Sequence, residues 1–304
     1  MKLTSLFFIL VSLMSNAQNI KVSNGKVQRF DNFKSEFVEA RNVDVWLPDG
    51  YNNKEKYAVL YMHDGQMLFD AETTWNQQAW EVDEVAGKLN AEGKVKKFIV
   101  VGIWNIAAKR HQEYFPQKPY ESLTQVQRDT ITAQLQKAGR TTAVFKPYSD
   151  LYLKFLVTEL KPFIDKTFST LTDKDNTFMG GSSMGGLISM YAICEYPEVF
   201  GAVACISTHW PGIFAVENNP IPESFYSYLR KNLPNPRTNR IYFDYGDQTL
   251  DALYPLLQKK VDAIMVEKGF TPVNWQTQFF PGKNHSEEAW AKRLPIPLEF
   301  LLKQ

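Results

Sequence analysis

The stretch Phe178-Met179-Gly180-Gly181-Ser182-Ser183-Met184-Gly185-Gly186 decides how this sequence folds. A short apolar run typical of a strand leads into it, and a helical pattern over 187–196 leaves it. Glycines stand two residues before and two residues after Ser183, which fits G-x-S-x-G, a tight strand-to-helix turn that exposes a serine above a sheet. Such strained backbone requires glycine because side chains would crowd it. Ser182 does not fit, since Met184 follows it at the second glycine position, so we expect Ser183 to be a nucleophile.

Outward from this turn, short apolar runs alternate with helical patterns. Several runs are apolar on both faces, which indicates a mostly parallel sheet covered by helices on both sides, an α/β fold. The sequence predicts strands over 43–47, 57–62, 98–104, 177–180, 203–207, 241–245 and 274–280, and helices over 79–89, 151–168 with a kink at Pro162, 250–268 and 287–302. A polar stretch at about 115–148 breaks the alternation, and we interpret it as a small helical insertion in a single domain.

Composition excludes several classes of protein. The 304 residues carry 34 Lys and Arg against 33 Asp and Glu, so no strong field favours nucleic acid or an anionic membrane. No nucleic-acid partner is expected, and the oligomeric state stays open. The two cysteines, Cys194 and Cys205, lie in apolar stretches and are interpreted mainly as small buried side chains, with a disulfide as the alternative.

The first 17 residues have the pattern of an export signal. Lys2 is a short basic region, 6–14 is an apolar run, and Ser15-Asn16-Ala17 offers small residues for cleavage before Gln18. The alternative, an anchoring helix, is disfavoured because this run is too short to span a bilayer. We therefore predict a signal peptide over 1–17, a mature domain over 18–304, no integral membrane association, and a secreted or periplasmic location.

A nucleophilic serine needs a base and an acid, and the chain has four histidines. In a fold with this turn the order is serine, acid, histidine. His285 follows the last predicted strand and is the expected base, whereas His111 is interpreted as solvated and His209 as lining the pocket. The acid follows the strand 241–245, where position alone does not separate Asp247 from Asp251.

Two backbone N–H groups must face the negative charge that develops during acyl transfer. Met184, directly after the nucleophile, supplies the first. The second is expected from the loop after the strand 57–62, where Gly65 allows close approach and Gln66 is the candidate donor. The alternative for His63-Asp64 in this loop is a pair of metal ligands, although no third ligand has suitable spacing.

Three separated motifs, His63-Asp64-Gly65-Gln66, the glycine-rich turn at 180–186, and Gly282-Lys283-Asn284-His285-Ser286, resemble the esterase D-like branch of the α/β-hydrolases. That group includes carbohydrate esterase family 1, siderophore esterases, S-formylglutathione hydrolases and mycolyltransferases. The resemblance runs from about Val43 to the C-terminus and implies the α/β-hydrolase fold. It also favours Asp251 over Asp247 as the acid, although the position where distant members carry it holds Thr249 here.

The resemblance further implies which residues approach the substrate. Trp104, Asn105, Arg110 and 113–116 are expected near the cleft, with packing within the loops as the alternative, and His63 is also a candidate for contact with substrate. The aromatic side chains of Trp104, Trp210 and Trp290 could stack on a sugar, although such residues more often pack in the core or at the rim of a site. Neither a metal nor an organic cofactor is expected.

These features predict a secreted serine esterase that acts on acylated carbohydrate or siderophore esters. Two rival functions remain. An acyltransferase would use the same residues with an alcohol in place of water, and a carbohydrate-binding module on an inactive hydrolase fold would need none of them. A strained serine turn together with a histidine disfavours the binding module.

Overall fold

A computed structural model describes residues 20–214 and 217–304. The predicted signal peptide lies outside the described residues. Their strands form one eight-stranded sheet in the order β1-β2-β4-β3-β5-β6-β7-β8. The strands are β1 (Lys26–Phe33), β2 (Arg41–Leu47), β3 (Ala58–His63), β4 (Phe98–Ile103), β5 (Thr177–Ser182), β6 (Ala202–Ile206), β7 (Arg240–Tyr245) and β8 (Trp275–Phe279).

Strands β3 to β8 are parallel to one another, and only β1 and β2 run antiparallel to their neighbours. The mostly parallel sheet predicted from sequence is therefore confirmed. All six residues of β3 are buried, as expected for a strand covered on both faces. The carboxyl ends of β3, β5, β6 and β7 lie at the same edge of the sheet, where ligands bind in open α/β folds.

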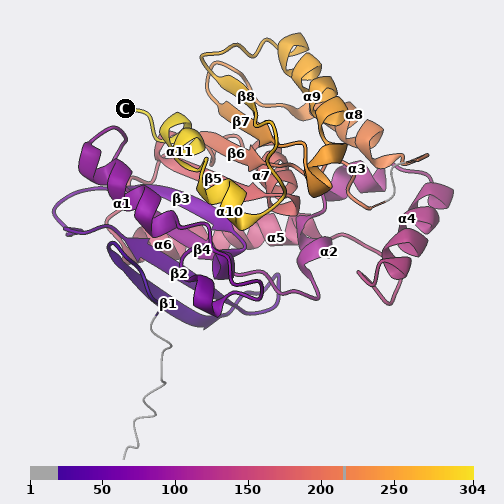
Figure 1. The fold of residues 1–304 in the computed structure, drawn as a ribbon. Helices are drawn as coiled ribbons and strands as arrows, with labels where there is room; N and C mark the ends of the chain where they lie inside the picture. The colour runs from indigo at the N-terminus through magenta and orange to yellow at the C-terminus, as the bar shows by residue number, and fades with distance from the viewer. Residues whose placement is uncertain (1–19, 215–216) are drawn as a thin grey trace, which may run out of the picture.

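Helices cover both faces of the sheet (Figure 1). They are α1 (Val82–Glu92), α2 (Arg110–Tyr114), α3 (Gln117–Glu121), α4 (Gln125–Lys137), α5 (Ser149–Phe155), α6 (Lys161–Thr167), α7 (Met184–Glu195), α8 (Ile221–Asn232), α9 (Pro255–Glu267), α10 (Glu287–Ala291) and α11 (Pro295–Leu301). Two apolar cores result. Strand β3 shows the alternation, because Val59 and Tyr61 join the core with α5 to α9, whereas Leu60 and Met62 join the core with α1, α10 and α11.

The helix predicted over 151–168 is interrupted. Helix α5 passes through a π-helical turn, Leu156–Leu160, into α6, and Pro162 lies in the first turn of α6. Proline lacks an N–H and is tolerated in a first turn, which explains why the irregularity precedes Pro162. The polar stretch at 115–148 contains α3 and α4, and α4 lies at the outer edge of the molecule (Figure 1). The division into a signal peptide and one domain with this insertion stays a prediction.

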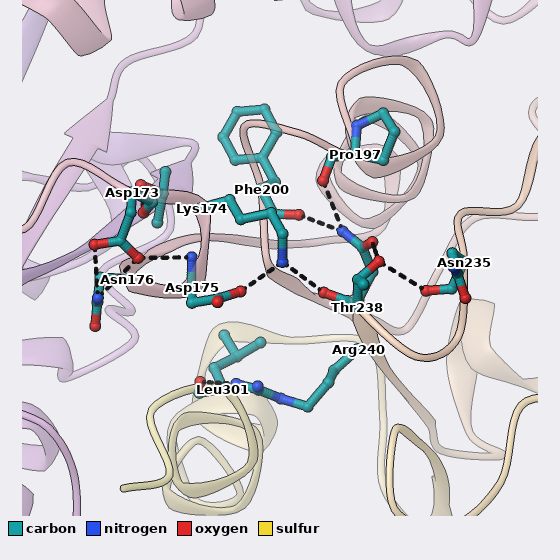
Figure 2. A network of polar contacts seen from close by, with 12 residues as sticks. Asp173, Lys174, Asp175, Asn176, Pro197, Phe200, Asn235, Thr238, Arg240 and Leu301 are labelled. Carbon is teal, nitrogen blue, oxygen red and sulfur yellow. Dashed lines mark hydrogen bonds and ion pairs between the residues drawn. The ribbon is translucent and has the colours of Figure 1, made fainter.

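Polar contacts fix the opposite edge of the sheet, at the amino ends of the strands (Figure 2). Lys174, before β5, donates from Nζ to the carbonyl of Thr238, before β7, at 2.8 Å. Arg240, the first residue of β7, donates to the carbonyl of Leu301 in α11 at 2.7 Å. These hydrogen bonds fix the amino ends of β5 and β7 relative to each other and to α11. They therefore help to fix the carboxyl ends of the same strands.

Both cysteines are free and buried, which confirms their interpretation as small core side chains. Burial raises the pKa of the Cys205 thiol well above its usual value, so that thiol stays protonated. Among the described residues, no helix is long and apolar enough to cross a membrane.

Candidate active site

Ser183 occupies the turn between β5 and α7, with φ 57° and ψ −119°. Only a tightly constrained turn holds a non-glycine residue in this strained region. A Cβ atom on Gly181 would lie 3.0 Å from the backbone carbonyl of Gly185, so the close approach of the two backbone segments requires glycine at position 181. The Ser183 side chain is partly exposed, whereas Ser182 is 5% exposed.

His285 and Asp251 form a close pair at the same edge of the sheet. His285 Nδ1 lies 2.6 Å from Asp251 Oδ1, and the Asp251 side chain is fully buried. Asp251 Oδ2 also accepts hydrogen bonds from Ser207 Oγ at 2.6 Å and from the Gly246 N–H at 2.7 Å. Burial opposes ionisation of this carboxyl, but its hydrogen bonds and the neighbouring imidazole outweigh burial and hold its pKa below the usual value.

A network of buried hydrogen bonds holds the Asp251 carboxylate in place. Ser207 Oγ, which donates to Asp251, accepts from Trp290 Nε1 at 3.1 Å and from Arg293 at 2.7 Å. Arg293 donates as well to Asp244 Oδ1 at 2.8 Å. The sequence did not predict this network, because its members come from β7, α10, the residue after β6 and the segment before α11. It fixes the carboxylate that orients His285.

The candidate oxyanion donors lie in the first turns of two helical segments. Met184 is the first residue of α7, and Gln66 lies in a 3-10 turn, Gly65–Met67, directly after β3. First-turn N–H groups have no partner within their own helix, so they are free to face an anion. A Cβ atom on Gly185 would lie 3.4 Å from Asp64 Oδ2, so the two turns pack against each other.

Asp64 holds the loop that carries Gln66. Its carboxylate accepts two hydrogen bonds from Arg110, both at 2.8 Å, and one from Asn105 Nδ2 at 2.7 Å. The Asn105 N–H donates in turn to Gln66 Oε1 at 3.2 Å. Burial raises and Arg110 lowers the pKa of Asp64, with a net decrease. Asn105 and Arg110, predicted to contact substrate, therefore position the loop through Asp64.

Of three other predicted contact residues, two are buried and Trp104 is partly exposed. His63 is 2% exposed, with Nδ1 3.0 Å from the Tyr152 hydroxyl. Trp210 is fully buried, and its indole N–H donates to Gln258 at 2.8 Å. Trp104 donates to Asp44 at 2.7 Å. The stacking role expected of Trp210 is wrong, because its ring packs in the core.

For two further residues, the structure differs from the role considered in the sequence analysis. Trp290, also considered for stacking, is 4% exposed and meets the His285 ring edge-on, with ring centres 4.9 Å apart. His111, expected in solvent, lies in α2 against Phe115 and Phe145. Burial lowers the pKa of His111 to about 3, so it is neutral. Because the sequence around His111 is polar, it did not predict that aromatic side chains would pack against this histidine.

Tyr254 is a residue of the site that the sequence did not indicate. Its hydroxyl lies 2.9 Å from Nδ1 of His209, whose backbone N–H donates to the Ser183 carbonyl at 3.2 Å. Its ring meets the His285 ring edge-on, with centres 5.9 Å apart. Tyr254 thus packs between the serine turn and the proposed base. Its only sequence signal is its position three residues after Asp251.

Metal ligation was an alternative for His63-Asp64. The Asp64 carboxylate is occupied by Arg110 and Asn105. Within 20–214 and 217–304, no group of three or more His, Cys, Asp or Glu residues is arranged to hold a metal ion.

Comparison with known proteins identifies the family of this chain. The family model described as "Putative esterase" matches residues 35–300. The chain belongs to this esterase family. A curated relative, the endo-1,4-beta-xylanase/feruloyl esterase of Xylanibacter ruminicola, is 29% identical to this chain over 191 residues. That match covers 59% of this chain and 21% of the relative, so this chain spans about a fifth of the relative's length.

Solved structures are similar in fold to this chain. A ferulic acid esterase is 21% identical, with a TM-score of 0.64 over 91% of this chain and 98% of its own. The ferric enterobactin esterase of Salmonella typhimurium is 17% identical, with a TM-score of 0.65 over 93% of this chain and 60% of its own. The predicted α/β-hydrolase fold is confirmed, and membership of the esterase family agrees with the prediction of an esterase.

Proposed function

We propose that this esterase is a serine carboxylic-ester hydrolase in which Ser183 is the nucleophile, His285 the base and Asp251 the acid. The observation that carries the proposal is the 2.6 Å contact between His285 and Asp251 beside the strained serine turn. Asp251 holds the imidazole in one orientation and stabilises its charged form, while Nε2 takes the serine proton.

The reaction proceeds in two steps. Ser183 Oγ attacks the ester carbonyl as His285 takes its proton, and the N–H groups of Met184 and Gln66 stabilise the oxyanion. His285 then protonates the departing alcohol. Water, deprotonated by His285, attacks the acyl-enzyme and releases the acid and free Ser183.

An exposed aromatic residue near the base favours an acylated carbohydrate as the substrate. Trp75 is 85% exposed. The next residue, Asn76, donates to Glu287 at 2.9 Å, and Glu287 lies two residues after His285. A flat indole held at this place suits the apolar face of a sugar ring in the alcohol part of the ester. The relatives named for feruloyl esterase activity support this class, and the enterobactin esterase supports siderophore esters as the second class.

The activity is tested with a panel of p-nitrophenyl acetate, feruloyl and acetyl sugars, and a catecholate siderophore ester. Ser183→Ala should lower kcat/KM on the order of 10³- to 10⁶-fold, whereas the neighbouring Ser182→Ala serves as the matched control. We expect the sugar esters to give the highest kcat/KM. Equal activity of wild type and Ser183→Ala would contradict the mechanism, and transfer to an added sugar faster than hydrolysis would make the enzyme an acyltransferase.

Export belongs to the proposal as well. The pattern over 1–17 supports removal of a signal peptide and a secreted or periplasmic enzyme. N-terminal sequencing of protein recovered outside the cytoplasm should begin at Gln18. Protein retained in the cytoplasm with Met1 intact would contradict it.

A further inference from the structure

Ser207 stands directly after β6 in strained backbone, and the two-step reaction described above assigns it no role. Its φ is 42°, in the left-handed region that few non-glycine residues adopt. Its N–H donates to the Asp244 carbonyl at 2.9 Å, which holds this turn in place. The residue is completely buried, and the turn places its Oγ 2.6 Å from Asp251 Oδ2. Strained backbone of this kind is typical of functional sites.

The neighbours of Ser207 determine the direction of its hydroxyl proton. A serine hydroxyl has one proton to donate and can accept two hydrogen bonds. Trp290 Nε1 donates to Oγ at 3.1 Å, and Arg293 donates to it at 2.7 Å. An indole N–H and a guanidinium can only donate. Both acceptor positions of Oγ are therefore filled, and the Ser207 proton is directed at Asp251.

Arg293 makes this hydroxyl a stronger donor. The guanidinium side chain is 3% exposed and lies 2.8 Å from Asp244 Oδ1. Consecutive hydrogen bonds polarise one another, so a hydroxyl that accepts from a charged group donates more strongly. Burial raises the pKa of Asp251, whereas His285, Ser207 and the N–H of residue 246 lower it, with a net decrease. Part of the negative charge of Asp251 is therefore compensated by Ser207, and the imidazole faces a weaker charge.

We propose that Ser207 is a positioning residue which, by donating its proton to Asp251, extends the activity of this esterase to lower pH. The inference rests on the proposed roles of Ser183, Asp251 and His285. His285 must be neutral to take the serine proton, and the negative charge of Asp251 favours the protonated imidazole. A hydrogen bond donated to the carboxylate weakens that effect. The imidazole therefore stays neutral at a lower pH than it would beside a carboxylate without this donor.

Other groups near the pair also carry charge or titrate. The charged and titratable side chains around Asp251 and His285 are Tyr254, His209, Asp244, Arg293 and Glu287. Burial raises the pKa of Tyr254 well above its usual value and lowers that of His209 well below its own, so both stay neutral. Burial raises the pKa of Asp244 to about 6, against the effect of Arg293. All of these groups are kept in the variants below, so the comparison with wild type measures the contribution of Ser207.

The test is the pH profile of kcat/KM for p-nitrophenyl acetate, measured on the full chain. In Ser207→Ala we expect the acid limb to move about 0.5 to 1 pH unit higher, because a hydrogen bond to a charged group is worth about 1 to 2 pH units and only part of it reaches the imidazole. On the plateau, kcat should fall roughly 2- to 10-fold. Ser224→Ala is the matched control, because its buried hydroxyl donates to the Ile221 carbonyl at 2.7 Å within α8. Its acid limb should stay at the wild-type pH.

Ser207→Gly separates the hydroxyl from the strained backbone. Glycine adopts a positive φ without strain, so this variant also decides the question if Ser207→Ala fails to fold. It should show the same shift of the acid limb to higher pH. An acid limb of Ser207→Gly at the wild-type pH would overturn the inference alone. So would a shift to lower pH, which would mean that Arg293 donates to Asp251 in place of Ser207. Wild-type activity in Ser183→Ala would overturn the proposed function and this inference with it.

Discussion

Asp251 and Asp247 differ in what surrounds each carboxylate. Asp251 is fully buried and faces His285, Ser207 and the Gly246 N–H. Asp247 is only partly buried, and it accepts from the Gly282 N–H at 2.7 Å. Position in the sequence left these two candidates open because both follow β7 within six residues. The family resemblance favoured Asp251, and the three-dimensional contacts give the two carboxylates different surroundings.

This difference predicts the effect of replacing each acid. Asp251→Asn should lower kcat about 10³- to 10⁴-fold, because the imidazole loses the group that fixes its tautomer and stabilises its charge. Asp247→Asn has the same change of charge and is the control, with a much smaller effect. Steady-state kinetics on p-nitrophenyl acetate measures both. A larger loss in Asp247→Asn would move the acid to that position.

His63 makes the stability of the protein depend on pH. Burial lowers the pKa of His63 from 6.5 to about 3, so the unfolded chain binds a proton more readily than the folded one. Stability is therefore fully present above pH 6.5 and is lost as pH falls from 6.5 toward 3. At pH 5 the loss from this residue is about 2 kcal/mol. His63→Gln should remove that part of the difference between urea unfolding at pH 7.5 and pH 5. An unchanged difference would show that His63 does not titrate in this way.

Helix α2 is held to the sheet by one buried ion pair. Arg41, at the start of β2, donates two hydrogen bonds to Glu113, at 2.8 and 2.6 Å, and both residues are nearly inaccessible. The same helix carries Arg110, which donates two hydrogen bonds to the Asp64 carboxylate. A buried pair of this kind fixes an element in place more than it stabilises the fold.

The ion pair predicts a characteristic pattern of stabilities. Arg41→Met leaves the Glu113 charge buried and unpaired, and should cost about 3–5 kcal/mol in the free energy of unfolding. The double variant Arg41→Met with Glu113→Leu should recover most of that loss, because neither charge remains. Urea denaturation measures both. A double variant no more stable than the single one would contradict this account.

Elements were predictable where local pattern determines them. Strands β2 to β8 follow short apolar or alternating runs, and each was expected to within a few residues. Strand β1 was missed because a shift of register between Phe30 and Phe33 breaks its alternation. Helix α8 was missed between prolines, although its buried residues Ile221, Phe225 and Leu229 have helical spacing. Pattern thus predicts regular elements and overlooks bulged or proline-flanked ones.

At the scale of the whole molecule, one edge of the sheet gathers the site. Ser183 follows β5, Asp251 follows β7, and His285 follows β8, so the order of strands alone brings these three segments together. That much could be predicted from sequence. The contacts of Tyr254 and Ser207 could not, because they join segments 44 to 83 residues apart through packing that no local pattern records.

The proposed mechanism depends on Ser183 as the nucleophile, activated by His285. Labelling with a fluorophosphonate, followed by fragmentation of the labelled peptide, identifies the nucleophile. We expect one adduct on Ser183, absent in Ser183→Ala, retained in Ser182→Ala, and formed far more slowly in His285→Ala. An adduct on another residue, or undiminished labelling of Ser183→Ala, would contradict it.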